Sequence, residues 1–242
     1  MVKESINIPA RFCGPSTSGN GGYVCGRVAR HLAGCACVRL KTPPPLETDL
    51  RIETSGSEAR LLDGSAVIAE ATGAELNLTP PHAPSFAEAG EAAKQYAGFT
   101  RHTFPRCFVC GPERTPGDGL RIFPGPAGRN GMVAAPWIPD ASLADTDGAV
   151  APEFLWAALD CPGAFAVMPV PEPGKAAVLG ELCARIDDAV NPGEHCVVTG
   201  WLLHSEGRKR YAGTTVFNAI GRAVAVARAV WIEVPADTFG SR

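Results

Sequence analysis

The sequence has no hydrophobic run long enough to cross a membrane, no excess of positive charge and no low-complexity segment. A membrane-spanning helix needs about 20 consecutive apolar residues, and no stretch of the 242-residue chain approaches that length. The formal net charge of -3 argues against a dedicated nucleic-acid binder, which would carry a basic surface. Charged residues, at 19%, are too sparse for a disordered chain, and the apolar fraction of 45% is ordinary for a folded domain. We therefore expect a globular protein with no nucleic-acid partner and no membrane partner.

Several motifs of catalytic and metal-binding proteins are also missing. There is no Gly-rich phosphate loop, no Ser-His-Asp order and no second Cys-x-x-Cys pair. The single pair, Cys107 and Cys110, supplies two ligands where a structural zinc site needs four, and His102 has no obvious partner in the sequence. We interpret this segment as a reduced turn and predict no metal and no cofactor.

The nine cysteines do not have the pattern of a secreted disulfide framework. Their number is odd, the chain is long, and several lie in strand-like or helix-like runs such as 34–40, 181–186 and 194–200. The first residues also show no apolar segment typical of a secretory leader. We expect reduced cysteines that act as small buried hydrophobes, and a cytoplasmic location.

The two halves of the chain repeat one order of elements: a loop, one long helix and four antiparallel strands. In the first half, a loop at 13–22 leads into an amphipathic helix, in which small residues recur at helical spacing and would let a neighbouring backbone come close (Gly22, Gly26, Ala29 and Ala33). Strands are predicted at 35–41, 46–54, 58–63 and 65–76, with an Asp-Gly hairpin signal at 63–64. In the second half, we predict a helix at 151–166, broken by Pro162-Gly163, and strands at 176–187, 194–205, 209–220 and 222–234.

The helix of the second half is apolar on every side from Phe154 to Leu159, so it must be buried all round. An antiparallel sheet that curls around the helix would meet that requirement. We therefore predict an α+β fold with two tandem units, each a sheet wrapped around one long central helix. The predicted boundaries are 1–80 and 107–242, joined by a linker at 81–106 that carries a short helix at 85–97.

This arrangement resembles the hotdog-fold acyl-CoA thioesterase superfamily in its fused, double-hotdog form. The segment CFVCGPERTPGDGLRIF (107–123) is similar to the opening of many single-domain members, and GNGGYVCGRVA (19–29) is similar to the family's His-Gly-Gly helix start, with Asn20 where His is usual. The resemblance implies an active site where two units pair, with Asp160 as the acid and Asn20, Gly21 and Gly22 as the helix start that polarises the thioester carbonyl.

Two departures from the family pattern limit this inference. The helix position that would carry an acid in the first half is Ala29, and no Gly-Gly pair precedes the helix of the second half. The first half therefore carries only the helix start and the second half only the acid, so we expect at most one composite site per chain.

Asp160 has two interpretations. Burial would raise its pKa and suit it to act as a general base. Alternatively, it caps backbone N–H groups that are freed where the helix breaks. Asn20 would cap its own helix in either case. We expect substrate contacts from Tyr23, Arg27, Glu153 and Trp156.

The predicted function is hydrolysis of an acyl thioester, with coenzyme A as the expected carrier, in a protein that forms a homo-oligomer. The alternative is a module that binds or senses an acyl-CoA without hydrolysing it. A hydratase would need a His–Asp pair facing the pocket, and the sequence indicates no such pair.

Overall fold

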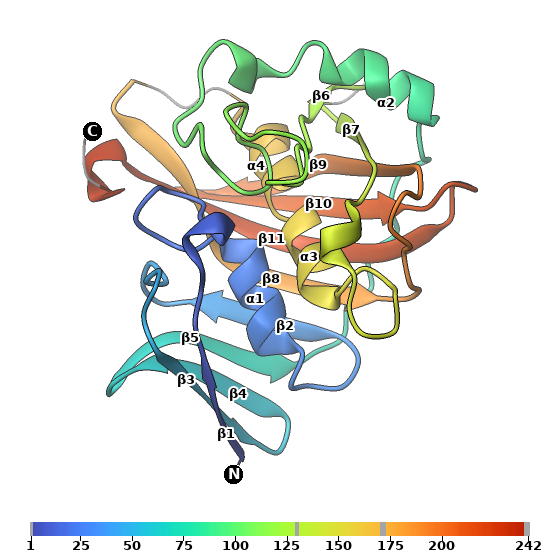
Figure 1. The fold of residues 1–242 in the computed structure, drawn as a ribbon. Coiled ribbons are helices and arrows are strands. Elements are labelled where there is room, and N and C mark those ends of the chain that lie inside the picture. Colours follow the sequence, from blue (N-terminus) through green and yellow to red (C-terminus); the bar gives the residue numbers. More distant parts are fainter. Residues whose placement is uncertain (1, 129–130, 170–172, 240–242) are drawn as a thin grey trace.

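A computed structural model describes residues 2–128, 131–169 and 173–239 (Figure 1). The strands form one antiparallel sheet in the order β1-β3-β4-β5-β2-β8-β11-β10-β9-β7-β6. Their bounds are β1 Val2–Ile6, β2 Ala36–Leu40, β3 Leu50–Ser55, β4 Glu58–Asp63, β5 Ala66–Gly73, β6 Gly125–Pro126, β7 Val133–Trp137, β8 Lys175–Ile186, β9 Cys196–Glu206, β10 Lys209–Phe217 and β11 Ala223–Pro235. All eight predicted strands are present, and the sequence analysis did not predict the edge strands β1 and β6 or their neighbour β7, which lies beside β6.

The sheet is continuous because β2 of the first half pairs with β8 of the second. At this seam Arg39 Nη2 lies 2.7 Å from Glu181 Oε2. Cys37 is opposite Cys183, and the two form a disulfide. The expectation that every cysteine is reduced is therefore wrong for this pair. Strand pairing places the two side chains opposite each other, a proximity that their separation along the chain hides.

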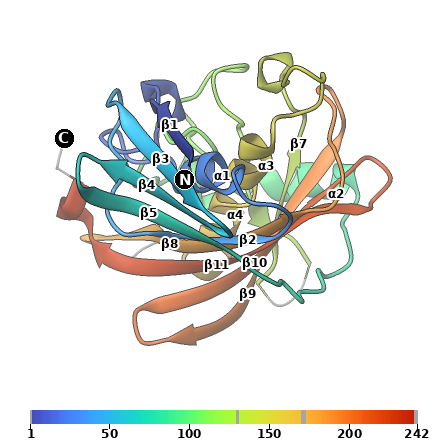
Figure 2. The same ribbon diagram turned by 90° about the horizontal axis from the view of Figure 1, so that it is seen from below.

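The helices lie on the concave side of the sheet, which curves around them (Figure 2). Their bounds are α1 Gly21–Ala29, α2 Phe86–Ala93, α3 Pro152–Ala158 and α4 Cys161–Val167. Helix α1 packs against β2, β4, β5 and β8, whereas α4 packs mainly against β9 and β10 and also contacts β7, β8 and β11. Helix α2, in the predicted linker, begins with a capping box between Ser85 and Glu88 and covers β6 and β7. No helix among the described residues is long and apolar enough to span a membrane.

Helices α1 and α3 pack with their backbones in close contact, as the small residues of α1 predict. A Cβ atom on Gly26 would lie 2.6 Å from Glu153 Cα, and one on Gly22 would lie 2.7 Å from the Trp156 carbonyl oxygen. These distances are shorter than any ordinary carbon contact, so only glycine fits at either position.

The helix of the second half is broken, as predicted, but the break lies at Leu159 and Asp160 and not at Pro162-Gly163, and it leaves two short helices, α3 and α4. Proline is tolerated in the first turn of a helix, and Pro162 occupies that place in α4, so the break precedes it. The Leu159 carbonyl, which the break leaves without a helical partner, accepts a hydrogen bond from Thr214 Oγ1 at 2.7 Å. The prediction of one long central helix per unit is therefore wrong for the second half. The prediction that α3 is apolar and buried on all sides is confirmed.

Candidate functional site

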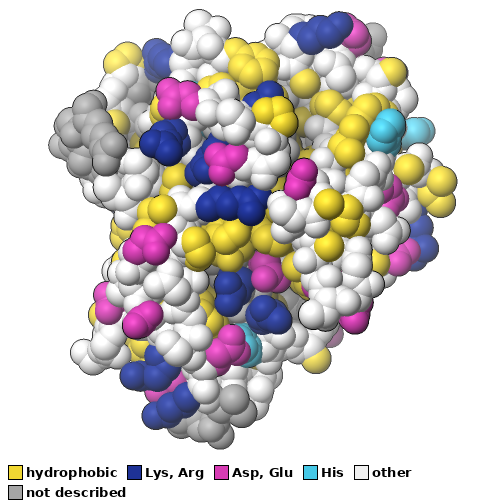
Figure 3. Space-filling view, in the orientation of Figure 1, with side chains coloured by type: hydrophobic (Ala, Val, Ile, Leu, Met, Phe, Trp, Pro, Cys, Tyr) yellow, Lys and Arg dark blue, Asp and Glu magenta, His cyan; other side chains and the backbone are white. Residues whose placement is uncertain are grey.

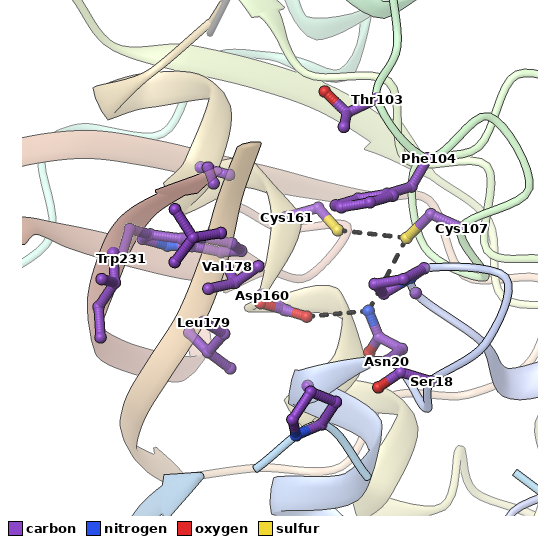
Figure 4. Close-up of a pocket in the computed structure, with 18 of the residues that line it drawn as sticks. Ser18, Asn20, Thr103, Phe104, Cys107, Asp160, Cys161, Val178, Leu179 and Trp231 are labelled. Carbon is purple, nitrogen blue, oxygen red and sulfur yellow. Dashed lines mark hydrogen bonds between the residues drawn. The ribbon is translucent and has the colours of Figure 1, made fainter. Parts of the chain in front are cut away.

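Asp160 lies at the α3–α4 break and contacts the N-terminus of α1 (Figure 4). Its side chain is 2% exposed. Its Oδ2 accepts hydrogen bonds from the Asn20 side-chain amide and the Gly22 backbone N–H, each at 2.9 Å. Its Oδ1 is buried and has no hydrogen-bond partner among the described residues. An acid from the second half of the chain and a helix start from the first half therefore meet.

Asn20 is the N-cap of α1, and the cap fixes its orientation. Its side-chain oxygen accepts a hydrogen bond from the Tyr23 N–H at 2.9 Å. The amide nitrogen must therefore point away from the helix, toward Asp160 and also toward Cys107 Sγ at 3.8 Å. The predicted capping role of Asn20 is confirmed.

The environment of Asp160 changes its acidity. Burial raises the pKa of Asp160 from its usual value of 3.8 to about 7, although the hydrogen bonds from Gly22 and Asn20 oppose the shift. A carboxyl group with a pKa near neutrality can both accept and return a proton at physiological pH.

Asp160 and the start of α1 line a cavity of about 320 Å³. Its walls are mostly apolar and come from the α1 start, the segment 101–110, α4, β8 and β11, with Leu40, Phe104, Phe165, Leu179 and Trp231 among the larger side chains. Gly21 lines the cavity, and its N–H makes no hydrogen bond to any described residue. Of the backbone N–H groups predicted to bind the thioester oxygen, that of Gly22 is used by Asp160, which leaves that of Gly21.

The four predicted substrate contacts lie apart from the residues that line this cavity. Tyr23 stacks on Phe12, with ring centroids 4.3 Å apart, in a cluster of aromatic rings. Arg27 donates to the Tyr23 hydroxyl at 3.1 Å and lies 3.8 Å from a carboxylate oxygen of Glu153, while Trp156 packs against Gly26. These residues hold α1 against α3. On the face seen in Figure 3, basic and acidic side chains are interspersed and form no single basic area.

Three cysteines form a cluster in the wall of the same cavity. The sulfur atoms of Cys107, Cys110 and Cys161 all lie within 4.8 Å of one another, and those of Cys107 and Cys161 are 3.6 Å apart. His102 Nε2 is 3.3 Å from Cys110 Sγ. Burial lowers the pKa of His102. Sequence reasoning identified Cys107, Cys110 and His102 but missed Cys161, because no motif spacing joins it to the pair.

Nearly the whole chain is similar in structure to several solved proteins, whereas no family model and no curated protein matches it. The tesB protein of Mycobacterium avium subs paratuberculosis superposes with a TM-score of 0.61 at 15% identity, and the match covers 96% of this chain and 93% of the other. The acyl-CoA thioesterase II TesB2 from Mycobacterium marinum has a TM-score of 0.63 at 10% identity, with the same coverage. A protein of Alicyclobacillus acidocaldarius described as having a hot dog fold has a TM-score of 0.61 at 10% identity. The expectation of a hotdog fold is confirmed.

Proposed function

We propose that this protein hydrolyses an acyl thioester in the cavity beside Asp160. The observation that carries the proposal is the meeting of two groups at one cavity, neither of which has a hydrogen-bond partner among the described residues. These groups are Asp160 Oδ1 and the Gly21 N–H at the start of α1. Both residues line the cavity, whose remaining wall is apolar enough to take an acyl chain. The names of the solved structures that share the fold support the same chemistry.

In the proposed mechanism, Asp160 removes a proton from a water molecule, whose oxygen attacks the thioester carbonyl carbon. The carbonyl oxygen becomes an oxyanion, which the Gly21 N–H and the positive end of the α1 dipole stabilise. The carbon–sulfur bond then breaks and the electron pair leaves with the sulfur. Asp160 returns its proton to the thiolate, so the products are a free acid and a thiol.

The proposal includes two tandem hotdog units, at 1–80 and 107–242, that share this one composite site. Support comes from the packing of the helices: α1 lies mainly on β2, β4 and β5 of the first half, with a further contact to β8, whereas α4 lies on the strands β7 to β11 of the second half. Asp160 then belongs to the later unit and Gly21 to the earlier one.

Coenzyme A is the proposed carrier because the cavity lining includes the basic residue Lys41, which now pairs with Glu70 at 2.7 Å and is 38% exposed, so that its ammonium group can meet a phosphate at the cavity. A homo-oligomer and a cytoplasmic location stay predictions, and light scattering of the purified chain would test the first.

The experiment is a thiol-release assay over a panel of acyl-CoA substrates, with wild-type protein, Asp160→Asn and the exposed control Asp147→Asn. The amide oxygen introduced at position 160 can accept both hydrogen bonds now made by Oδ2, so the variant keeps its local contacts. We expect kcat to fall by about 10²–10⁴, the range attributed to general-base catalysis, with substrate binding by calorimetry unchanged. The control should match wild type.

Equal rates for wild type and Asp160→Asn would remove Asp160 from the mechanism. Binding of an acyl-CoA without release of thiol by the wild-type protein would favour the alternative, a non-catalytic acyl-CoA sensor. A sensor role would suit a carboxylate that is fully capped by backbone N–H groups and remote from any cavity. Within the described part of the chain, Asp160 accepts one backbone N–H bond and lines the cavity, which supports the catalytic role.

A further inference from the structure

The cysteine cluster of Cys107, Cys110 and Cys161 takes no part in the proposed hydrolysis, yet its composition and geometry are those of a metal site. All three thiols are free and buried, and all three line the cavity. Among the described residues, the other group of potential ligands contains Cys37 and Cys183, which are already joined to each other.

The sulfur positions suit a tetrahedral ion. A zinc–sulfur bond of about 2.3 Å at tetrahedral angles places two sulfur ligands about 3.8 Å apart. The observed separation of Cys107 Sγ and Cys161 Sγ is 3.6 Å, and no pair in the cluster exceeds 4.8 Å. Adjustments of about an ångström would therefore close the sulfurs around one ion, whereas a disulfide would need about 2.05 Å.

Two N–H donors already point at the sulfurs. The Phe104 N–H donates to His102 Nδ1 at 2.9 Å, so in the neutral ring the proton is on Nε2, which lies 3.3 Å from Cys110 Sγ. The cap of α1 likewise orients the Asn20 amide nitrogen toward Cys107 Sγ at 3.8 Å. Donors of this kind stabilise thiolates and tune metal ligands from the outer shell.

The elements that carry the ligands are held in place. The Gly111 N–H donates to the Cys107 carbonyl at 2.9 Å and closes the turn that holds Cys107 and Cys110. A Cβ atom on Gly111 would lie 2.5 Å from that carbonyl oxygen, so the tight turn requires glycine. Cys161 is the first residue of α4, which packs on the sheet.

We propose that Cys107, Cys110 and Cys161 bind one zinc-class divalent ion as thiolates, with the fourth coordination position open to the cavity. Because His102 donates its Nε2 proton toward sulfur, it supports the site from outside and is not a ligand. Three protein ligands with one open position is the pattern of zinc sites that hold an exchangeable water or substrate group. The hydrolysis proposed above uses no metal, so either proposal can fail without the other.

The test is metal binding by the full-length protein after chelation and dialysis, with Zn²⁺ and Co²⁺ as probes and elemental analysis for stoichiometry. We expect one ion per chain and, for Co²⁺, a thiolate charge-transfer band in the near ultraviolet with intense tetrahedral d–d bands. Cys107→Ser and Cys161→Ala should abolish the complex. Cys196→Ser, at a buried free cysteine outside the cavity lining, should bind like wild type.

A further variant distinguishes the proposed hydrogen-bond donor His102 from the three metal ligands. His102→Phe should keep the stoichiometry but weaken Zn²⁺ binding about 10- to 100-fold. Circular dichroism checks that each variant is folded; a folded Cys161→Ala protein that binds one ion as tightly as wild type would overturn the proposal. So would the absence of any stoichiometric Zn²⁺ or Co²⁺ complex in the wild-type protein.

Discussion

Replacement of Gly26 by alanine tests whether the backbone contact between α1 and α3 sets the geometry of the site. The added Cβ atom would lie 2.6 Å from Glu153 Cα and 2.8 Å from Trp156 Cβ. Carbon atoms pack at about 3.5–4.0 Å, so the helices must separate by roughly 1 Å. Neither of the opposing atoms is the end of a flexible side chain, so no simple rotation relieves the clash.

Two opposing effects determine the free energy of unfolding of Gly26→Ala. Alanine favours a helix over glycine by about 0.8–1 kcal/mol, whereas overpacking of a close contact costs about 1–3 kcal/mol. Because the clash involves backbone, we expect the cost to prevail and the variant to lose about 1–2 kcal/mol. For a chain of this size that corresponds to a melting temperature lower by about 2–8 °C.

Gly90→Ala is the matched control, since Gly90 lies within helix α2 and a Cβ atom there would meet nothing within 4 Å. We expect this variant to gain about 0.8–1 kcal/mol from helix propensity alone. Urea titrations measure both effects, and the thiol-release assay should show reduced kcat/KM only for Gly26→Ala, because separation of the helices moves Gly22 away from Asp160. If Gly26→Ala is as stable and as active as Gly90→Ala, the close helix contact does not set the site.

Further substitutions test the free amide of α1 and the support of the helix break. Gly21→Ala keeps the backbone N–H but would place a Cβ atom 2.9 Å from Leu179 Cδ2 and 3.0 Å from Leu179 Cβ in the cavity wall. We expect at least a tenfold loss of kcat/KM, because the added atom obstructs the approach of the thioester to this amide. Unchanged activity would show that the thioester does not bind against Gly21. Thr214→Val leaves the buried Leu159 carbonyl without its donor and should lower the free energy of unfolding by about 1–3 kcal/mol. Thr215→Val removes a buried hydroxyl that has no partner among the described residues, so this variant should be as stable as wild type or more stable. Equal effects of the two variants on urea unfolding would contradict this reasoning.

Much of the fold could be predicted from the sequence because its signals are local. The predicted strand at 58–63 matches β4 residue for residue, and the hairpin to β5 lies at the expected Asp-Gly signal, with Asp63 paired to Ala66 and Gly64 and Ser65 in the turn. Strand β1 was missed because Val2–Ile6 is short and carries Lys3, Glu4 and Ser5 in its middle. It is a strand because β3 offers an open edge, which is a property of the fold and not of the segment.

The candidate site was predictable only in part. Asp160 could be identified because a carboxyl group in an apolar helix is costly to bury without donors, and Asn20 because it precedes a helix. The donors themselves could not be assigned from the sequence, since they depend on how α1 meets the α3–α4 break. The same limit applies to Cys161, which joins Cys107 and Cys110 only through tertiary structure.

The arrangement around Asp160 explains why the carboxyl group is tolerated in an apolar setting. The start of α1 supplies the donors that oppose the effect of its desolvation, and the neighbouring Gly21, whose N–H has no partner among the described residues, lines the cavity. In the proposed mechanism the positive end of one helix therefore serves the base and the oxyanion together. Any change that withdraws α1 from α3 must weaken both, so Gly26→Ala should lower activity by more than its effect on stability alone would cause.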